Sequence, residues 1–204
     1  MNEIKLTRFT VHERLVHWTV ALSFLYAALT GLALWSPRMY WLSYIFGGGP
    51  TVRAWHPLGG VIFVAAFTAM FQNWCTQMQL DIDDRKWLRQ AHRYAVHDTA
   101  GLPEAGRFNG GQKLLFWVQA VNGILLLASG IILWFPELMP RALRVIAVLV
   151  HPLAAVVSIA GIIVHIYMGT AAVPEAFRGM IQGWVTPQWA ASHHPKWYRQ
   201  IRRN

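Results

Sequence analysis

Four long apolar runs constrain the fold of this chain more than any other feature. They cover residues 15–35, 56–74, 114–135 and 145–173, and none of them contains Asp, Glu, Lys or Arg. A helix rises about 1.5 Å per residue, so runs of this length suit a hydrocarbon core of roughly 30 Å. We therefore predict an all-α integral membrane protein, a single domain over residues 1–204 whose four transmembrane helices form a bundle. The first run is too long for the apolar part of a signal peptide, so we expect it to stay in the mature protein.

The basic residues predict the orientation of these spans. Of the 18 Lys and Arg residues, 14 fall on the side that holds both termini, and only Arg38, Arg53, Arg141 and Arg144 fall on the other. Cytoplasmic loops of membrane proteins carry the excess of positive charge. Both termini, the loop at 77–113 and the tail at 174–204 are therefore expected in the cytoplasm. The net charge of +9 then reflects topology and attraction to anionic lipids, and does not indicate a nucleic-acid partner.

Two histidines lie in the last and most apolar run. His151 and His165 are 14 positions apart, close to four helical turns, so both leave the same helix face at a separation of about 21 Å. Small residues such as Ala154, Ser158 and Gly161 lie between them on that face. A hydrogen-bonded core histidine in a helix-packing face is the structural alternative, but ionisable groups inside a membrane are costly and usually functional.

Two further histidines lie at matching depths. His17 lies near the cytoplasmic end of the first run, and His56 is the first residue of the second run, at its outer end. The last run enters from the outer side, so depth pairs His17 with His165 and His56 with His151. Inverting the whole protein would leave both pairs unchanged.

Two imidazoles at one depth, with small residues beside them, suit a haem iron bound on both faces. With both axial positions filled, such an iron carries single electrons, and two haems form a path across the membrane. Cys75 is the only cysteine, which excludes a four-cysteine iron–sulfur site and a C-x-x-C-H haem attachment. Zinc or copper would need three or four ligands at one depth. A haem-free transporter with membrane histidines is the alternative from another class, although no span carries an Asp or Glu.

Several polar or aromatic segments outside the four runs can be interpreted without a bound cofactor. The apolar spacing at 87–95 predicts an amphipathic helix on the membrane surface, and the spacing of Phe177, Ile181 and Trp184 predicts a helix in the tail. The turn at 107–113 has, by periodicity alone, the character of an ordinary helix start. The remaining histidines are expected at the solvated surface: His12, His92, His97 and the pair His193 and His194.

The chain also resembles a known family, the dihaem cytochrome b (gamma) subunits of membrane-bound, quinone-linked formate dehydrogenases. The histidine motifs are shared with cytochrome b subunits of hydrogenases and related oxidoreductases, whereas the turn and the tail single out formate dehydrogenase. The matching segments are His-Glu-Arg-Leu-Val-His-Trp at 12–18, Arg-Phe-Asn-Gly-Gly-Gln-Lys at 107–113, His-Pro-Leu-Ala-Ala at 151–155, Val-His-Ile-Tyr at 164–167, Gly-Trp-Val-Thr at 183–186 and His-His-Pro-Lys-Trp-Tyr-Arg at 193–199.

The resemblance implies roles for individual residues. The inner haem b would be bound by His17 and His165, and the outer haem b by His56 and His151. The turn at 107–113 becomes part of a quinone site beside the inner haem. The positions that match this site are Asn109, Gly111, Gln112 and His165. Gly110 departs from the family pattern, in which a larger aromatic residue is common, and would alter the shape of the pocket.

The resemblance also implies partners and a location. Formate would be oxidised on an alpha subunit that holds molybdenum or tungsten, and an iron–sulfur beta subunit would pass electrons to the outer haem. The acceptor would be menaquinone or ubiquinone, reduced near the cytoplasmic side of a bacterial inner membrane. The heterotrimer could assemble further into a higher oligomer. A dihaem subunit of a quinone-linked hydrogenase, or of another molybdenum oxidoreductase, is the alternative within this class.

Overall fold

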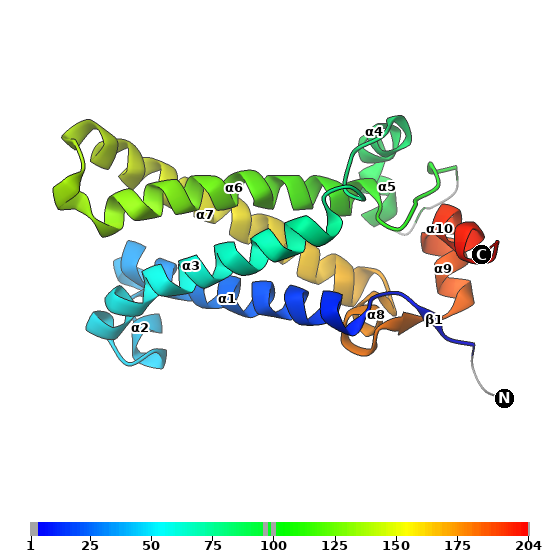
Figure 1. The fold of residues 1–204 in the computed structure, drawn as a ribbon, viewed down its shortest axis with the longest axis horizontal. Coiled ribbons are helices and arrows are strands. Elements are labelled where there is room, and N and C mark those ends of the chain that lie inside the picture. Colours follow the sequence, from blue (N-terminus) through cyan, green and yellow to red (C-terminus); the bar gives the residue numbers. More distant parts are fainter. Residues whose placement is uncertain (1–3, 96–97, 99–100, 204) are drawn as a thin grey trace. The chain divides into compact units, whose positions relative to one another are not determined.

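The computed structural model describes residues 4–95, 98 and 101–203, and in this part of the chain four helices are long and apolar enough to cross a membrane. They appear in Figure 1 as the four long ribbons, and the predicted all-α fold with four spans is confirmed. Their bounds are α1 (Val11–Trp35), α3 (Gly49–Trp74), α6 (Gly110–Trp134) and α7 (Arg141–Tyr167), the last continued by a π-helical stretch, η3 (Met168–Ala172).

The helices begin earlier than their apolar runs. Helix α3 begins at Gly49 rather than at His56, so Pro57 lies inside the helix and not in its first turn, as we had expected. Pro152 lies inside α7 in the same way. A proline removes one helical hydrogen bond, which transmembrane helices tolerate because neighbouring groups satisfy the freed carbonyl.

The chain divides into two compact units. One, here called the bundle unit, comprises Leu15–Asn73 and Gln119–Ala160. The other, here called the terminal unit, comprises Met1–Arg14, Trp74–Val118 and Gly161–Asn204.

The bundle unit contains most of the four long helices and the connections at their outer ends. The connection between α1 and α3 holds a 3-10 turn, η1 (Pro37–Met39), and a short helix, α2 (Leu42–Ile45); a second 3-10 turn, η2 (Pro136–Leu138), joins α6 to α7. Ala33, Leu42 and Val52 form a small buried cluster where α2 covers the ends of α1 and α3. Large apolar side chains are exposed along the long helices, for example Leu22, Ile62 and Leu149. This is expected where lipid replaces water as the solvent.

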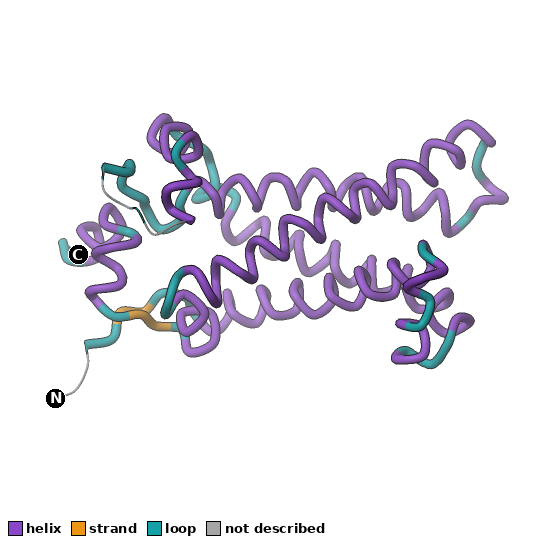
Figure 2. Tube along the Cα trace, turned by 180° about the vertical axis from the view of Figure 1, so that it is seen from behind, coloured by secondary structure: helices purple, strands orange, loops and turns teal. Residues whose placement is uncertain are grey.

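The terminal unit is built from short elements. Helices α4 (Ile82–Arg89) and α5 (Ala91–Ala95) follow α3, and α8 (Ala176–Gln182), α9 (Pro187–His193) and α10 (Pro195–Ile201) follow η3. Strands β1 (Leu6–Thr7) and β2 (Trp184–Val185) form the antiparallel pair drawn in orange in Figure 2. The buried core of this unit consists of Trp87, Tyr94, Ala172, Val173, Val185, Trp189, Ala190 and Trp197.

Two expectations for these segments were wrong. The helix predicted at 87–95 is two helices that break at Gln90, and its aromatic face packs into the core of the terminal unit instead of lying on the membrane surface. The tail helix ends before Trp184, because Gly183 takes a left-handed φ of 87°, which terminates a helix. His92 is exposed, as expected, and His97 lies outside the described residues.

Candidate functional site: a paired-histidine cavity

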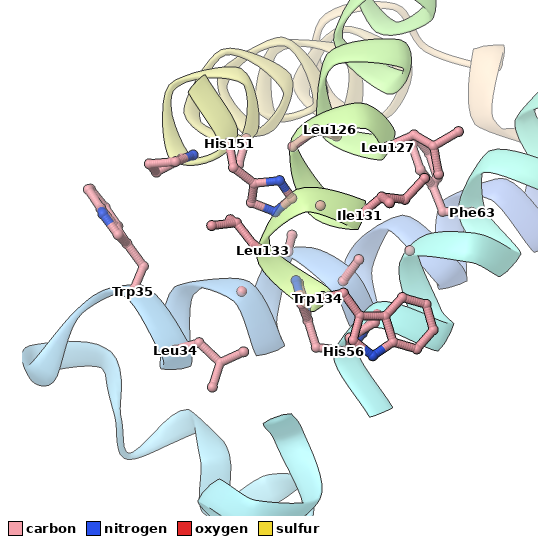
Figure 3. Close-up of a pocket in the computed structure, with 18 of the residues that line it drawn as sticks. Leu34, Trp35, His56, Phe63, Leu126, Leu127, Ile131, Leu133, Trp134 and His151 are labelled. Carbon is pink, nitrogen blue, oxygen red and sulfur yellow. The ribbon is translucent and has the colours of Figure 1, made fainter. Parts of the chain in front are cut away.

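A cavity of about 680 Å³ lies within the bundle unit, between residues of α1, α3, α6 and α7. His56 of α3 and His151 of α7 both line it, and Figure 3 shows the two rings among mainly apolar side chains. Arg53 and Glu137 are the charged residues of the lining. A cavity of this size and character is typical of sites for bulky, largely apolar ligands.

The two imidazole rings lie close together across this cavity. The centroids of His56 and His151 are 6.3 Å apart, and their planes make an angle of 79°. Metal–nitrogen bonds are about 2 Å long. Two such bonds, plus the distance from each coordinating nitrogen to the centre of its ring, come close to the observed separation. The pair therefore has the spacing needed to bind one metal ion between the rings.

A threonine of α1 fixes the tautomer of His56. Thr30 Oγ1 donates a hydrogen bond to the Tyr26 carbonyl at 2.7 Å and lies 2.9 Å from His56 Nδ1. Because the single hydroxyl proton is already used, Nδ1 must be the donor in this second contact. Nε2 then carries the lone pair and is the atom available to a metal. Thr30 is completely buried, with 0% of its surface exposed.

A serine of α6 holds His151 in the same manner. Ser129 Oγ donates to the Leu125 carbonyl at 2.5 Å and lies 2.9 Å from His151 Nδ1. Nδ1 is again the donor, which leaves Nε2 as the potential ligand. Hydrogen bonds to the second ring nitrogen are the usual means of orienting metal-bound histidines. Neither hydroxyl was singled out by the sequence analysis, because Ser and Thr are common in membrane helices; their matching depth with the histidines was the available signal.

Each histidine also packs on a glycine next to its hydroxyl partner. A Cβ atom on Gly31 would lie 3.2 Å from His56 Cε1, and one on Gly130 would lie 3.3 Å from His151 Cε1. Both distances are tighter than usual for carbon atoms, so a larger residue at either position would push its ring out of place.

This chemistry fits a haem better than a metal cluster. Among the described residues there is no group of three or more His, Cys, Asp or Glu side chains that could hold a metal ion. Zinc and copper centres usually require three or four protein ligands, whereas a bis-histidine haem iron requires two, the porphyrin supplying the rest. The two Nε2 atoms, the apolar cavity and the small residues beside the rings all suit such a group.

The other two histidines belong to different units. His17 lies on α1 in the bundle unit, half-buried, with its ring edge-on to Trp18 at 5.4 Å. His165 lies in the last turn of α7 in the terminal unit and is also half-buried. Their pairing therefore stays a prediction.

The polar turn at 107–113 is a reciprocal helix cap. The backbone N–H of Gln112 donates to Asn109 Oδ1 at 2.9 Å, and that of Asn109 donates to Gln112 Oε1 at 3.0 Å. This is the geometry of a capping box at the start of α6. It satisfies two helix N–H groups and agrees with the interpretation of the turn as a helix start. It uses only the amide oxygens, so the side-chain NH2 groups of both residues remain available as donors.

Ion pairs on both sides hold this turn in place. Arg107 Nη2 donates to Glu13 Oε1 at 2.7 Å, and Lys113 Nζ donates to Asp84 Oδ2 at 2.5 Å. Both carboxylates belong to other segments of the terminal unit. Gly111 could not be replaced without disturbance, because its Cβ would lie 3.2 Å from the Trp87 ring.

The tail histidines are not a solvated pair, contrary to our expectation. His194 is only 2% exposed; its Nδ1 lies 2.8 Å from the Gly106 carbonyl and its Nε2 lies 3.3 Å from Arg8 Nη2. Burial, aided by the charge of Arg8, holds the pKa of His194 well below its usual value. Burial also lowers the pKa of Arg8 to about 9, with the neighbouring Arg107 acting in the same direction. Trp189 and Trp197, which flank the pair in sequence, pack against His194, the first tilted and the second edge-on, and were the signal for its burial.

Comparison with known proteins identifies the family of this chain. Residues 8–183 match the family model described as prokaryotic cytochrome b561. The chain is 38% identical over 201 residues to the formate dehydrogenase cytochrome b556(fdo) subunit of Escherichia coli K12, covering 97% of this chain and 94% of that protein. It is 32% identical over 202 residues to the formate dehydrogenase cytochrome b556 subunit of Haemophilus influenzae, covering 98% and 84%.

A third relative is the nitrate-inducible formate dehydrogenase cytochrome b556(Fdn) subunit of Escherichia coli K12, 32% identical over 194 residues and covering 94% of this chain and 89% of that protein. The similarity thus extends over the four helices and both units. The chain is a multi-pass membrane protein that belongs to the prokaryotic cytochrome b561 family and is similar over nearly its whole length to the cytochrome b556 subunits of formate dehydrogenases.

Proposed function

We propose that this chain is the membrane-anchoring cytochrome b subunit of a formate dehydrogenase complex and carries electrons across the membrane to a quinone. The observation that carries the proposal is the facing pair His56 and His151, whose Nδ1 atoms are each held by a buried hydroxyl so that both Nε2 atoms remain available as ligands. The family and the named relatives support the same function.

In the outer site, the chain's own residues bind and orient one haem b. Thr30 and Ser129 fix the ligating tautomers, while Gly31 and Gly130 allow the rings to pack closely. Arg53 is the cationic residue of the lining and would pair with a haem propionate. A haem b held by His56 and His151 would supply single-electron transfer.

The inner part of the proposed electron path depends on the pairing of His17 with His165, which was predicted from their depths in the sequence. His17 and His165 would bind a second haem b near the cytoplasmic side, and the quinone would be reduced beside it. Asn109, Gly111 and Gln112 would form the quinone-binding turn. The amide NH2 groups left over by the helix cap are the donors that a quinone carbonyl requires.

Electrons would reach the outer haem from an iron–sulfur beta subunit, which receives them from a molybdenum- or tungsten-containing alpha subunit that oxidises formate. The quinone would be menaquinone or ubiquinone, and the membrane the bacterial inner membrane. Electron flow inward and proton uptake from the cytoplasm would together charge that membrane. The chain would thus be the quinone-reducing part of a formate:quinone oxidoreductase.

Two alternatives are less well supported. A haem-free transporter does not account for membership of a cytochrome b family. The histidines alone would also suit a hydrogenase or another molybdenum oxidoreductase, but the named relatives are formate dehydrogenase subunits over nearly the whole chain.

The test is to purify the chain from native membranes with its partners. A pyridine haemochrome spectrum should give two non-covalent b haems per chain, and both should be reduced by formate. A folded complex without haem would exclude the electron-transfer function. If the two haems were reduced by hydrogen or another donor but not by formate, the chain would still be a dihaem cytochrome b. Its partner would then not be a formate dehydrogenase.

A further inference from the structure

A cluster of uncharged polar side chains is buried in the middle of the bundle unit. It consists of Gln119 and Asn122 of α6 and Ser158 of α7, and Ser158 is 0% exposed. Gln119 Nε2 donates a hydrogen bond to the Ser158 carbonyl at 3.1 Å, so the cluster joins the two helices. Asn122 follows Gln119 by three residues and therefore lies on the same face of α6. Neither amide was assigned a role by the motifs or by the resemblance.

Two polar atoms of this cluster are left over. Asn122 Nδ2 and Ser158 Oγ are buried and have no hydrogen-bond partner in the described part of the chain. Buried polar groups are nearly always satisfied, by other protein groups or by ordered water. Hydrocarbon cannot satisfy them at this depth in a membrane. The two atoms therefore indicate a small hydrogen-bonding ligand between α6 and α7.

One water molecule has the right reach for this position. Gln119 contacts Ser158 directly, and Asn122 lies about 4.5 Å farther along α6 than Gln119. Two hydrogen bonds of ordinary length to one water oxygen span up to roughly 5–6 Å. A single water can therefore bond to both Asn122 Nδ2 and Ser158 Oγ.

There is also room for a ligand beside Asn122. Gly123, the next residue of α6, is buried, but a Cβ atom built on it would meet no described atom within 4 Å beyond its chain neighbours and its own helix backbone. By contrast, a Cβ on Gly31 or Gly130 of the same unit would lie 3.2 or 3.3 Å from a histidine ring. Protein interiors are normally close-packed. Open space next to a buried amide is typical of sites that bind water, whereas apolar cavities stay dry.

The cluster lies between the two predicted haem sites in depth. Ser158 is seven residues from His151 and seven from His165 in α7, about 10 Å along the helix from each. The outer cavity extends along α6 as far inward as Leu126, one turn from Asn122. An electron that passes from the outer to the inner haem must therefore cross the depth of this cluster.

We propose that Asn122 and Ser158 bind a water molecule at the mid-depth of the bundle unit, and that this water reorients with the charge of the two haems. The water accepts a hydrogen bond from Asn122 Nδ2 and bonds to Ser158 Oγ, so both buried atoms are satisfied. Its response to the haems rests on the function proposed above. The water site itself depends only on residues of this chain.

The physical role of such a water follows from its dipole. Inside a low-dielectric bundle a dipole acts more strongly on a charge than it does in bulk water. A water held by two bonds can still turn, so its hydrogens point toward whichever haem holds the extra electron. This reorientation stabilises the electron on either side and reduces the cost of moving charge through the centre of the membrane. No bond is broken and no proton is transferred.

The water site is tested by the sign of a change in thermal stability. Ser158→Ala and Gly123→Ala are compared with Ser23→Ala, a span variant whose hydroxyl already donates to the Thr19 carbonyl at 2.7 Å. The intact complex is heated, and the soluble fraction of this chain is followed with an antibody to a tag on it, so the readout does not depend on haem.

The water site predicts a lower midpoint in both test variants. Ser158→Ala removes one bond of the water, and the methyl group of Gly123→Ala takes its space and leaves two polar atoms unsatisfied. Each should lower the midpoint by roughly 2–4 °C, and Ser23→Ala should leave it nearly unchanged. If the two atoms were simply unsatisfied, Ser158→Ala would remove an unpaired hydroxyl and Gly123→Ala would fill empty space. Both midpoints would then rise, and the water site would be refuted.

The response to the haems is tested by infrared difference spectra between the oxidised and the reduced complex. Spectra are recorded in ordinary water and in water labelled with a heavy oxygen isotope. The unmodified complex and Ser23→Ala should show an O–H stretching band of a weakly bonded water that shifts on labelling. The band should be absent from Asn122→Leu, Ser158→Ala and Gly123→Ala, each with its haem content unchanged.

Two infrared results would overturn the proposed response. One is an unmodified complex whose haems are oxidised and reduced without any label-sensitive water band. The other is a band that persists in both Asn122→Leu and Ser158→Ala, because the responding water would then lie elsewhere. Failure of the proposed function would look different: a chain without haem gives no redox spectrum at all, while the midpoints still decide the water site.

Discussion

Removing the two hydroxyls that hold the histidines is the sharpest test of the outer site. Thr30→Val and Ser129→Ala each delete an acceptor from a buried Nδ1–H at 2.9 Å. An unsatisfied buried donor costs about 1–3 kcal/mol, and loss of such an outer partner typically lowers metal affinity by about 10–100-fold. Both variants should therefore bind the outer haem less tightly.

The redox potential gives a second and more specific readout. An Nδ1–H that donates a hydrogen bond makes the imidazole a stronger ligand and favours ferric iron. Losing a bond worth about 0.5–1.5 kcal/mol should raise the midpoint potential by roughly 20–65 mV, if the whole of that energy distinguishes the two oxidation states. Optical redox titration of the purified complex would measure this shift. Only one of the two haems should move, and it should be the same haem in both variants.

The chain offers matched controls for these variants. Thr68→Val and Ser23→Ala remove hydroxyls that bond only to backbone carbonyls, Val64 O at 2.8 Å and Thr19 O at 2.7 Å. Neither control should change a haem potential. If Thr30→Val and Ser129→Ala shifted different haems, His56 and His151 could not share one iron. If neither variant differed from its control, the hydroxyls would not fix the tautomers.

Three further predictions address the remaining residues. His56→Ala and His151→Ala should each abolish the same haem, and His17→Ala the other, as counted by haemochrome and redox titration; loss of different haems from the first two would refute the pairing. Asn109→Asp keeps the capping oxygen but loses the NH2 donor, so it should weaken quinone binding about ten- to a hundredfold with haem content and thermal stability nearly unchanged. Because burial lowers the pKa of His194, the unfolded chain binds a proton that the folded chain does not as pH falls below about 6.5. The free energy of unfolding of the terminal unit should therefore decline with acidification by at most about 1.4 kcal/mol per pH unit. In His194→Gln this dependence of stability on pH should be weaker, as measured by the rate of proteolysis at each pH.

The long helices were predictable because their signal is long and simple. A run without charge over the width of a bilayer has few alternatives to a membrane helix. Their ends were harder to predict. Helix α3 reaches back to Gly49, because Arg53 and Trp55 can lie on a helix at the membrane surface as well as in a loop.

The short elements could not be predicted from periodicity. Strands β1 and β2 have two residues each, too few to show alternation. The burial of His194 depends on Arg8, from the opposite end of the chain, and on the Gly106 carbonyl. Contacts between segments so far apart in sequence leave no local pattern.

The site was partly predictable. The depth argument named His56 and His151, and the structure places their rings 6.3 Å apart. It did not name Thr30 or Ser129, since a hydroxyl that bonds its own helix backbone looks the same in sequence as one that also orients a ligand.

The hydroxyl and glycine beneath each outer histidine also have a consequence for the ancestry of the bundle. Thr-Gly at 30–31 precedes His-Pro at 56–57, and Ser-Gly at 129–130 precedes His-Pro at 151–152. Each helical hairpin thus carries a histidine on its descending helix and the support for it on its ascending helix. Two hairpins that cross a membrane in the same order have the topology of a parallel repeat. A single hairpin of this type contains one complete half of the site, so two copies of it, unlinked, would suffice to coordinate one iron.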